Sequence, residues 1–98
     1  MYCKAWKYSV SSNHSLFEEA YGRNGEWFKF FESCDEFLGQ EIMRSAEGTF
    51  YLVLEKWISI EDYEHFLSSN RDAFEAISSN TESLYEEKLN LGSYTVLQ

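Results

Sequence analysis

Residues 49–57 are predicted to form a β-strand that is apolar on both of its faces. Alternate residues of a strand point to opposite sides of the sheet. One side carries Phe50, Leu52 and Leu54, and the other carries Tyr51, Val53 and Trp57. An antiparallel strand with one side in water normally alternates apolar and polar residues. Both faces of the sheet that contains this strand therefore need a cover.

Three further segments are predicted to be strands. Alternation with a period of two residues marks residues 2–10 as a strand, and residues 37–44 are expected to form another. Residues 45–48 are a hairpin-sized connection that leads into residues 49–57. A last strand is expected near residues 92–97, after a looser segment at residues 81–91.

Two helical segments separate these strands. The first begins after cap-type residues at positions 11–13, is interrupted by the glycine-bounded segment 22–25, and resumes to about Ser33. The second opens with a capping box, in which Ser59 and the acidic Asp62 can satisfy the first backbone amides of a helix. Its apolar stripe consists of Ile60, Tyr63, Phe66, Leu67, Phe74 and Ile77.

The order strand, helix, strand, strand, helix, strand is typical of the α+β, ferredoxin-like fold. This fold is a four-stranded antiparallel sheet with both helices on one face. With 98 residues, the chain is expected to form a single domain. Two helices cover one face only, so we expect the sheet of an identical chain to cover the other in a homodimer. The alternative is that residues 81–91 fold over the second face within one chain.

Composition argues against several classes of partner. The chain has 17 acidic and 8 basic side chains, and a surface with a formal charge of −9 repels nucleic-acid phosphates. The longest purely apolar run, residues 50–54, is too short to span a bilayer. The N-terminus has no signal-peptide pattern, and Cys3 and Cys34 have no metal-ligand spacing. We expect a cytoplasmic protein with reduced thiols, and neither nucleic acid nor membrane as a partner.

The aromatic content exceeds what the core of so small a domain needs. The chain has three Trp, seven Tyr and eight Phe. Surplus aromatic residues usually line a pocket or an interface. The residues that we expect around a pocket between the sheet and the helices are Tyr8, Trp27, Tyr51, Trp57 and Tyr63. Core packing alone is the alternative explanation for each of them.

Two glutamates, Glu41 and Glu55, interrupt strand faces that are otherwise apolar. A buried carboxylate needs a partner, and an ion pair across the sheet or between subunits is the structural interpretation. The basic residues within reach are Lys4, Lys7, Lys56 and Arg44. The functional interpretation is that one of the two is a catalytic base in a pocket, with a raised pKa.

Short motifs spread over the chain from about Tyr8 to Tyr94 occur in a characteristic order. They are Tyr21-Gly22-x-x-Gly25-x-Trp27-x-x-Phe30-Phe31, Phe37-Leu38-Gly39, Tyr51-Leu52 with Trp57-x-Ser59, and Leu91-Gly92-x-Tyr94. Their order and spacing resemble those of the antibiotic biosynthesis monooxygenase (ABM) domain. The resemblance implies a dimeric α/β barrel, in which two ferredoxin-like sheets lie face to face. It also implies that a substrate binds between the sheet and the helices of each subunit.

The resemblance further implies an activity. Members of the family oxidise polycyclic phenols and quinols without flavin or metal, and others degrade haem with an Asn on the first strand and a Trp and a His on the second helix. Here residues 2–10 contain no Asn, Phe66 stands near the Trp position, and residues 77 and 78 near the His position are Ile and Ser. Haem degradation is therefore disfavoured.

Two hypotheses about function follow. The first is a monooxygenase that acts on a small aromatic or quinol and needs no cofactor or metal. The second is a non-catalytic dimeric module that binds a small apolar ligand or only assembles.

Overall fold

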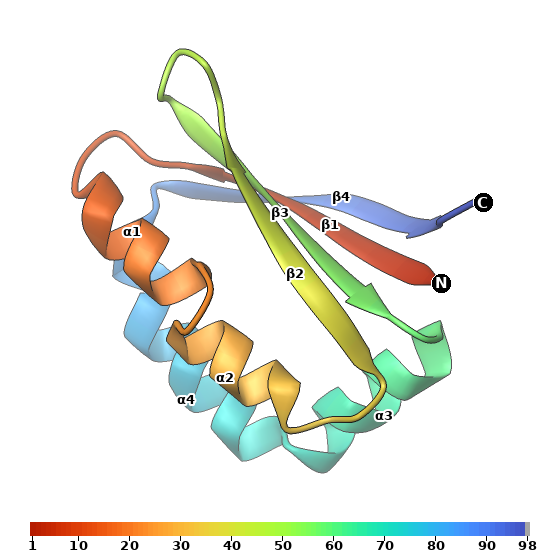
Figure 1. Ribbon diagram of the computed structural model, residues 1–98. Helices are drawn as coiled ribbons and strands as arrows, with labels where there is room; N and C mark the ends of the chain where they lie inside the picture. The colour runs from red at the N-terminus through yellow and green to blue at the C-terminus, as the bar shows by residue number, and fades with distance from the viewer. Residues whose placement is uncertain (98) are drawn as a thin grey trace.

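The computed structural model describes residues 1–97 and contains one four-stranded antiparallel sheet with a layer of helices (Figure 1). The strands are β1 (Tyr2–Ser9), β2 (Phe37–Arg44), β3 (Phe50–Trp57) and β4 (Glu87–Thr95). They lie in the order β2-β3-β1-β4, so β1 and β3 are central. The helices are α1 (His14–Tyr21), α2 (Glu26–Glu32), α3 (Ile60–Ser69) and α4 (Arg71–Thr81). The expected ferredoxin-like α+β fold is confirmed.

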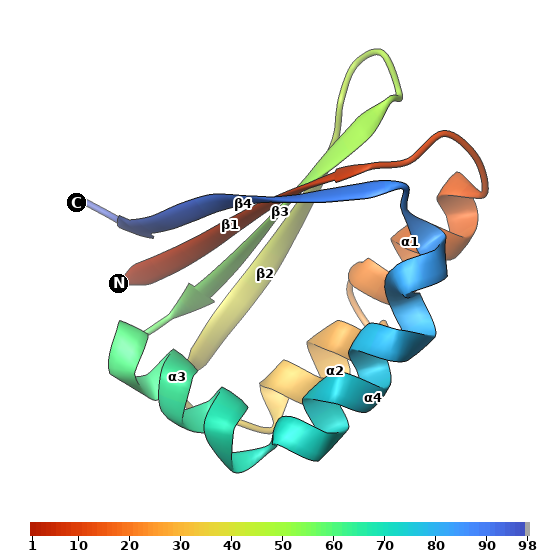
Figure 2. The same cartoon turned by 180° about the vertical axis from the view of Figure 1, so that it is seen from behind.

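All the helices lie on the same side of the sheet. Figures 1 and 2, which view the molecule from opposite directions, both show the helical layer below the sheet and no element above it. Among the described residues, no helix is both long enough and apolar enough to cross a membrane. We call the sheet face that the helices cover the inner face, and the opposite one the outer face.

The inner face of β3 forms the floor of the core. Burial along β3 alternates strictly, and the residues that are buried beneath the helices are Tyr51, Val53, Glu55 and Trp57. Trp57 has no exposed surface, and the ring of Phe31 from α2 meets it edge to face at 5.4 Å. Because aromatic rings bury large areas, stacking of this kind holds the helices on the sheet.

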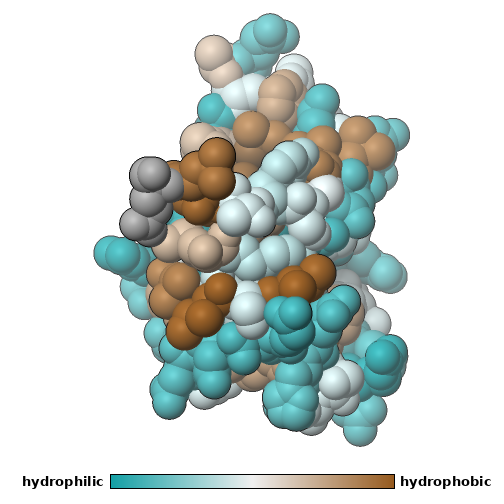
Figure 3. All heavy atoms as spheres, turned by 90° about the vertical axis from the view of Figure 1, so that its right-hand side faces the viewer, coloured by the Kyte–Doolittle hydropathy of each residue, from teal (hydrophilic) through white to brown (hydrophobic). Residues whose placement is uncertain are grey.

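The outer face of β3 carries Phe50, Leu52 and Leu54. These side chains are only partly buried, and none of them packs against the core under the helices. The register also places Ala5, Met43, Leu89 and Tyr94 on this face, together with the charged Lys7 and Glu41. Figure 3, seen from the side on which both termini lie in Figure 1, shows several separate apolar patches in its upper and middle parts, whereas hydrophilic residues dominate its lower edge. The strand is therefore apolar on two sides, and the helices cover only one of them.

Two interruptions bend the helical layer. Gly22-Arg23-Asn24-Gly25 separates α1 from α2, as the sequence predicts. The apolar stripe predicts one long second helix, and this prediction is wrong in one respect: Asn70 divides the segment into α3 and α4. The amide of Asn70 donates to the carbonyl of Phe66 at 2.8 Å, so its side chain competes with the helical hydrogen-bond pattern.

The segment at residues 81–91 does not cover the outer face. Thr81 ends α4, Glu82–Leu84 forms a single 3₁₀ turn, and β4 begins at Glu87 and pairs with β1. The last strand therefore starts five residues earlier than the 92–97 range that its sequence suggests. A bulge opposite Ala5 and Trp6 breaks the alternation within β4, which hides its pattern.

Gly25 provides a test of the packing between α1 and α2. A Cβ atom at residue 25 would lie 2.3 Å from the carbonyl oxygen of Glu19 and 2.4 Å from that of Ala20. Because these are backbone atoms, the helices would have to separate, and we expect Gly25→Ala to lower the free energy of unfolding by about 1–3 kcal/mol. Urea denaturation measures this free energy of unfolding. Glu26→Ala, at the exposed neighbouring residue, is the control and should change stability by less than about 0.5 kcal/mol. Equal stability of the two variants would contradict this packing.

Candidate functional site

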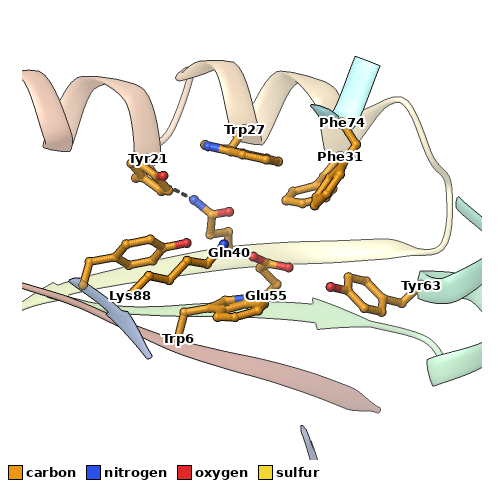
Figure 4. Close-up of a pocket in the computed structure, with 10 residues that line it drawn as sticks. Trp6, Tyr21, Trp27, Phe31, Gln40, Glu55, Tyr63, Phe74 and Lys88 are labelled. Atoms are coloured by element: carbon orange, nitrogen blue, oxygen red, sulfur yellow. Dashed lines mark hydrogen bonds between the residues drawn. The ribbon is translucent and has the colours of Figure 1, made fainter. Parts of the chain in front are cut away.

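A cavity of about 110 Å³ lies between the inner face of the sheet and the helices. Most of its wall is aromatic, formed by Trp6, Tyr8, Tyr21, Trp27, Phe31, Tyr63 and Phe74. Three other side chains complete it, namely Gln40 from β2, Glu55 from β3 and Lys88 from β4. Figure 4 shows these polar groups rising from the sheet toward the aromatic rings of the helical layer. An apolar pocket with a few convergent polar groups is the usual form of a small-molecule site.

Glu55 is the one carboxylate among the residues that line the cavity. Its side chain is 7% exposed, and its Oε1 atom has no hydrogen-bond partner among the described residues. Burial raises the pKa of Glu55 to about 7, although the positive charges of Lys88 and Lys4 and the indole of Trp6 act in the opposite direction. A carboxyl group with this pKa is half ionised near neutral pH, which suits a general base.

Lys88 brings a positive charge to the same cavity. Its Nζ atom lies 4.2 Å from the centre of the Trp6 ring, so the ammonium sits over an aromatic face. Burial lowers the pKa of Lys88, and the negative charge of Glu55 partly offsets that effect. Within residues 1–97, Lys88 belongs to no ion pair. Its charge is therefore available to a ligand.

The tyrosines of the cavity are neutral hydrogen-bonding groups. Burial raises the pKa of Tyr21 to about 12, and it also raises the pKa values of Tyr8 and Tyr63. In Figure 4 the hydroxyl of Tyr63 points toward Glu55. Trp27 is fixed in the roof, where its Nε1 donates to Thr81 Oγ1 at 3.3 Å. Trp27 is only 6% exposed, so it belongs both to the core and to the cavity wall.

Four residues that the sequence suggests for the site lie together around the cavity. They are Tyr8, Trp27, Glu55 and Tyr63. Tyr51 and Trp57 lie on the same face of β3 as Glu55 but are not part of the wall. Tyr51 stacks on Phe17 at 4.6 Å, and Trp57 is enclosed by rings of the opposite end of the core. Both are therefore core residues.

Glu41 lies away from the cavity. It belongs to the outer side of β2, is exposed, and forms an ion pair with Lys56 at 2.7 Å. This is the cross-strand pair that the structural interpretation of the sequence suggests. Alternation along β2 explains the difference between the two glutamates, because Gln40 rather than Glu41 is opposite Glu55 on the inner face.

Several residues of the site were not expected from the sequence. Trp6 shares the inner face with Tyr8, and the period of β1 could have indicated it. Gln40 and Lys88 carry no signal of their own, because their roles depend on strand pairing. Lys88 in particular falls before the range predicted for the last strand. Among the described residues, no three His, Cys, Asp or Glu side chains are grouped so that they could hold a metal ion.

Comparison with known proteins gives matches at the level of structure. No family model and no curated protein matches the sequence. SnoaB, a cofactor-independent oxygenase from Streptomyces nogalater, superposes with a TM-score of 0.77 at 17% identity, over 99% of this chain and 93% of that one. A candidate antibiotic biosynthesis monooxygenase from Bordetella bronchiseptica superposes with a TM-score of 0.75 at 13% identity, over 99% and 97% of the two chains.

The chain shares the fold of these two proteins. A third similar structure, a dimeric ferredoxin-like protein from an uncultured marine organism, has a TM-score of 0.71 at 11% identity, over 99% of this chain and 89% of that one. The resemblance seen in the sequence motifs is thus confirmed for the fold over nearly the whole length. At these identities, likeness to an ABM protein carries the fold and not the activity.

The raised pKa of Glu55 predicts a pH-dependent stability. The neutral carboxyl is favoured in the folded state, so its contribution to the free energy of unfolding is fully present below the unfolded pKa of about 4.5 and is lost as the pH rises through about 7. The Glu55→Gln variant has no carboxyl at this position and does not lose stability in this way. We therefore expect the free energy of unfolding of Glu55→Gln, relative to that of the parent, to rise by about 2 kcal/mol between pH 5 and pH 8 in urea denaturation. Glu41→Gln, on the exposed side, should give no such trend. A pH-independent difference for Glu55→Gln would show that Glu55 titrates normally.

Proposed function

We propose that this protein is a cofactor-independent monooxygenase that oxidises a small, electron-rich phenol or quinol. The observation that carries the proposal is the buried carboxylate of Glu55, with a pKa of about 7 and no hydrogen-bond partner for its Oε1 atom, inside an aromatic cavity. The chemistry needs a base, an apolar slot for the ring, and a positive charge near a developing oxyanion. Glu55 can supply the base, the aromatic wall can supply the apolar slot, and Lys88 can supply the positive charge. SnoaB, which has the same fold, is a cofactor-independent oxygenase.

The reaction needs no external reductant, because the substrate itself supplies the electrons. A phenol with a free para position and O₂ give a para-quinone and water, so one oxygen atom enters the ring. Glu55 first takes the hydroxyl proton, and the phenolate then passes one electron to O₂. The phenoxyl radical and superoxide combine at the para carbon, and Glu55 returns its proton to the resulting peroxide. Loss of the para hydrogen as a proton cleaves the O–O bond, and the hydroxide that leaves becomes water.

The cavity restricts the substrate by its size and its charge. An engineered apolar cavity of about 150 Å³ holds benzene, so a volume of about 110 Å³ suits one ring better than several fused rings. Lys88 would stabilise the phenolate and the superoxide, which both carry negative charge. The low polarity of the wall strengthens that attraction. Trp27 would lie against the face of the bound ring.

The proposed active form is a homodimer built through the outer face of the sheet. That face carries Phe50, Leu52 and Leu54 on β3, and nothing in residues 1–97 covers it. A stable interface buries about 800 Å² per partner, which a four-stranded sheet face can provide. A ferredoxin-like protein of similar structure is dimeric. Two such sheets face to face would form a dimeric α/β barrel, with each cavity on the opposite side of its own sheet from the interface.

Oxygen consumption tests the activity. With single-ring phenols that have a free para position as substrates, the purified protein should consume O₂ and form a para-quinone that carries one oxygen atom from O₂, without added flavin, haem or metal. Glu55→Gln should lower the rate by about 10²-fold or more, because the base is lost. Glu75→Gln carries the same change at an exposed residue of α4, away from the cavity and the outer face, and should retain the parent rate. Binding of these compounds without any turnover would instead support the non-catalytic, ligand-binding alternative, and equal rates for the two variants would exclude Glu55 as the base.

Leu52→Glu tests the dimer. The parent should sediment at equilibrium with twice the chain mass of 11.6 kDa at micromolar concentration. A carboxylate at the centre of the outer face should shift the mass toward that of one chain, since its desolvation in an interface is costly even with Lys7 opposite it on β1. Leu16→Glu, at a half-exposed residue of α1 in the helical layer, should leave the dimer intact. A parent protein that stays monomeric at high concentration would rule out this assembly.

A further inference from the structure

We propose that Gln40 selects substrates that carry a second hydrogen-bond donor, in addition to the hydroxyl that Glu55 deprotonates. The inference rests on the proposed function in that it takes the cavity as the substrate site. It adds a specificity-determining residue and a chemical requirement: the ligand is a single-ring arene with two donor groups, such as a benzenediol or an aminophenol.

The orientation of the Gln40 amide is fixed by its neighbour. Its Nε2 donates to the backbone carbonyl of Tyr21 at the end of α1. Because a carbonyl oxygen can only accept, the NH₂ group of Gln40 must face Tyr21, and the amide oxygen must face away from it. Figure 4 shows that oxygen on the side of the cavity, below Trp27 and Phe31.

The Oε1 atom of Gln40 is a buried acceptor without a donor. It has almost no exposed surface, and within residues 1–97 no group donates a hydrogen bond to it. Buried polar atoms in proteins are nearly always paired, so each exception calls for a functional explanation. The tether to Tyr21 prevents the amide from turning toward another partner. A donor on a bound ligand is the group that would complete this site.

The second unpartnered acceptor of the cavity stands beside the first. Gln40 and Glu55 are directly opposite each other in the β2–β3 ladder, and Glu55 Oε1 also lacks a partner. Side chains opposite each other in an antiparallel pair start from Cβ atoms about 4.5–5.5 Å apart. A ligand with one hydroxyl satisfies only one of these acceptors and leaves the other buried and unpaired. A ligand with two donors on one ring satisfies both, and the cavity has room for one ring.

Anaerobic calorimetry separates this requirement from catalysis. Phenol is the one-donor probe, and catechol, resorcinol and hydroquinone are the two-donor probes. For the parent protein we expect at least one diol to bind with a Kd about tenfold or more below that of phenol, since an unpaired buried acceptor is costly. Gln40→Met keeps the length of the side chain and removes the acceptor. It should weaken the binding of that diol to the level of phenol and leave the Kd for phenol unchanged.

Controls distinguish selection from a structural role of Gln40. Ile42→Met changes the same strand on the same face but outside the cavity wall, and should preserve the preference for the diol. If Gln40→Met is too unstable to assay, the parent protein still tests the requirement for a second donor, because the proposal requires it to bind a diol more tightly than phenol. Equal affinity of the parent for phenol and all diols, no binding of any probe, or equal losses for phenol and diol in Gln40→Met would each overturn the proposal.

Experiment can reject the monooxygenase activity and the selectivity of Gln40 separately. Diol binding that depends on Gln40, without O₂ consumption in air, would retain the selectivity and remove the monooxygenase activity. Turnover of phenol and diols with equal efficiency would retain the activity and remove the role of Gln40.

Discussion

The burial of one carboxylate beneath a layer of aromatic rings is the constraint around which this structure is arranged. Glu55 occupies the inner face of a central strand, where its neighbours in the same row are Tyr51, Val53 and Trp57. Taking an ionised carboxylate out of water is costly, and no ion pair compensates Glu55 within the described residues. The cost is expressed as a pKa raised to about 7. A protein that needed only stability would be better served by an apolar residue at this position.

The two faces of β3 have different surroundings. The inner face holds the core and the candidate site, and its aromatic rings fix the helices above Glu55. The outer face of β3 is apolar and open, and it suits a second copy of the chain. Because the cavity lies on the opposite side of the sheet from that interface, the dimer would support the site without supplying residues to it. Many of the aromatic residues are accounted for by the core and by the cavity wall.

The sequence predicts those parts of the structure that depend on local pattern. The two apolar faces of β3 and the interruption by Glu55 follow from a period of two, and the break between α1 and α2 follows from two glycines. The start of β4 cannot be predicted in this way, because its bulge disrupts the alternation. Gln40 and Lys88 were missed for a different reason. They reach the site through pairing of strands that are distant in sequence, and pairing register is a property of the folded sheet.

The proposed function depends on Glu55 being a cavity-facing base that titrates near neutral pH. The most direct test is a ¹³C NMR titration of the glutamate side-chain carboxyls in the intact protein, with Glu55→Gln to assign the resonance. We expect one carboxyl resonance with a midpoint near pH 7, which is absent from the spectrum of Glu55→Gln. A Glu55 resonance that titrates near the ordinary glutamate pKa of about 4.3 would contradict it. The carboxylate would then be well solvated, and the cavity would lack the base that the proposed reaction requires.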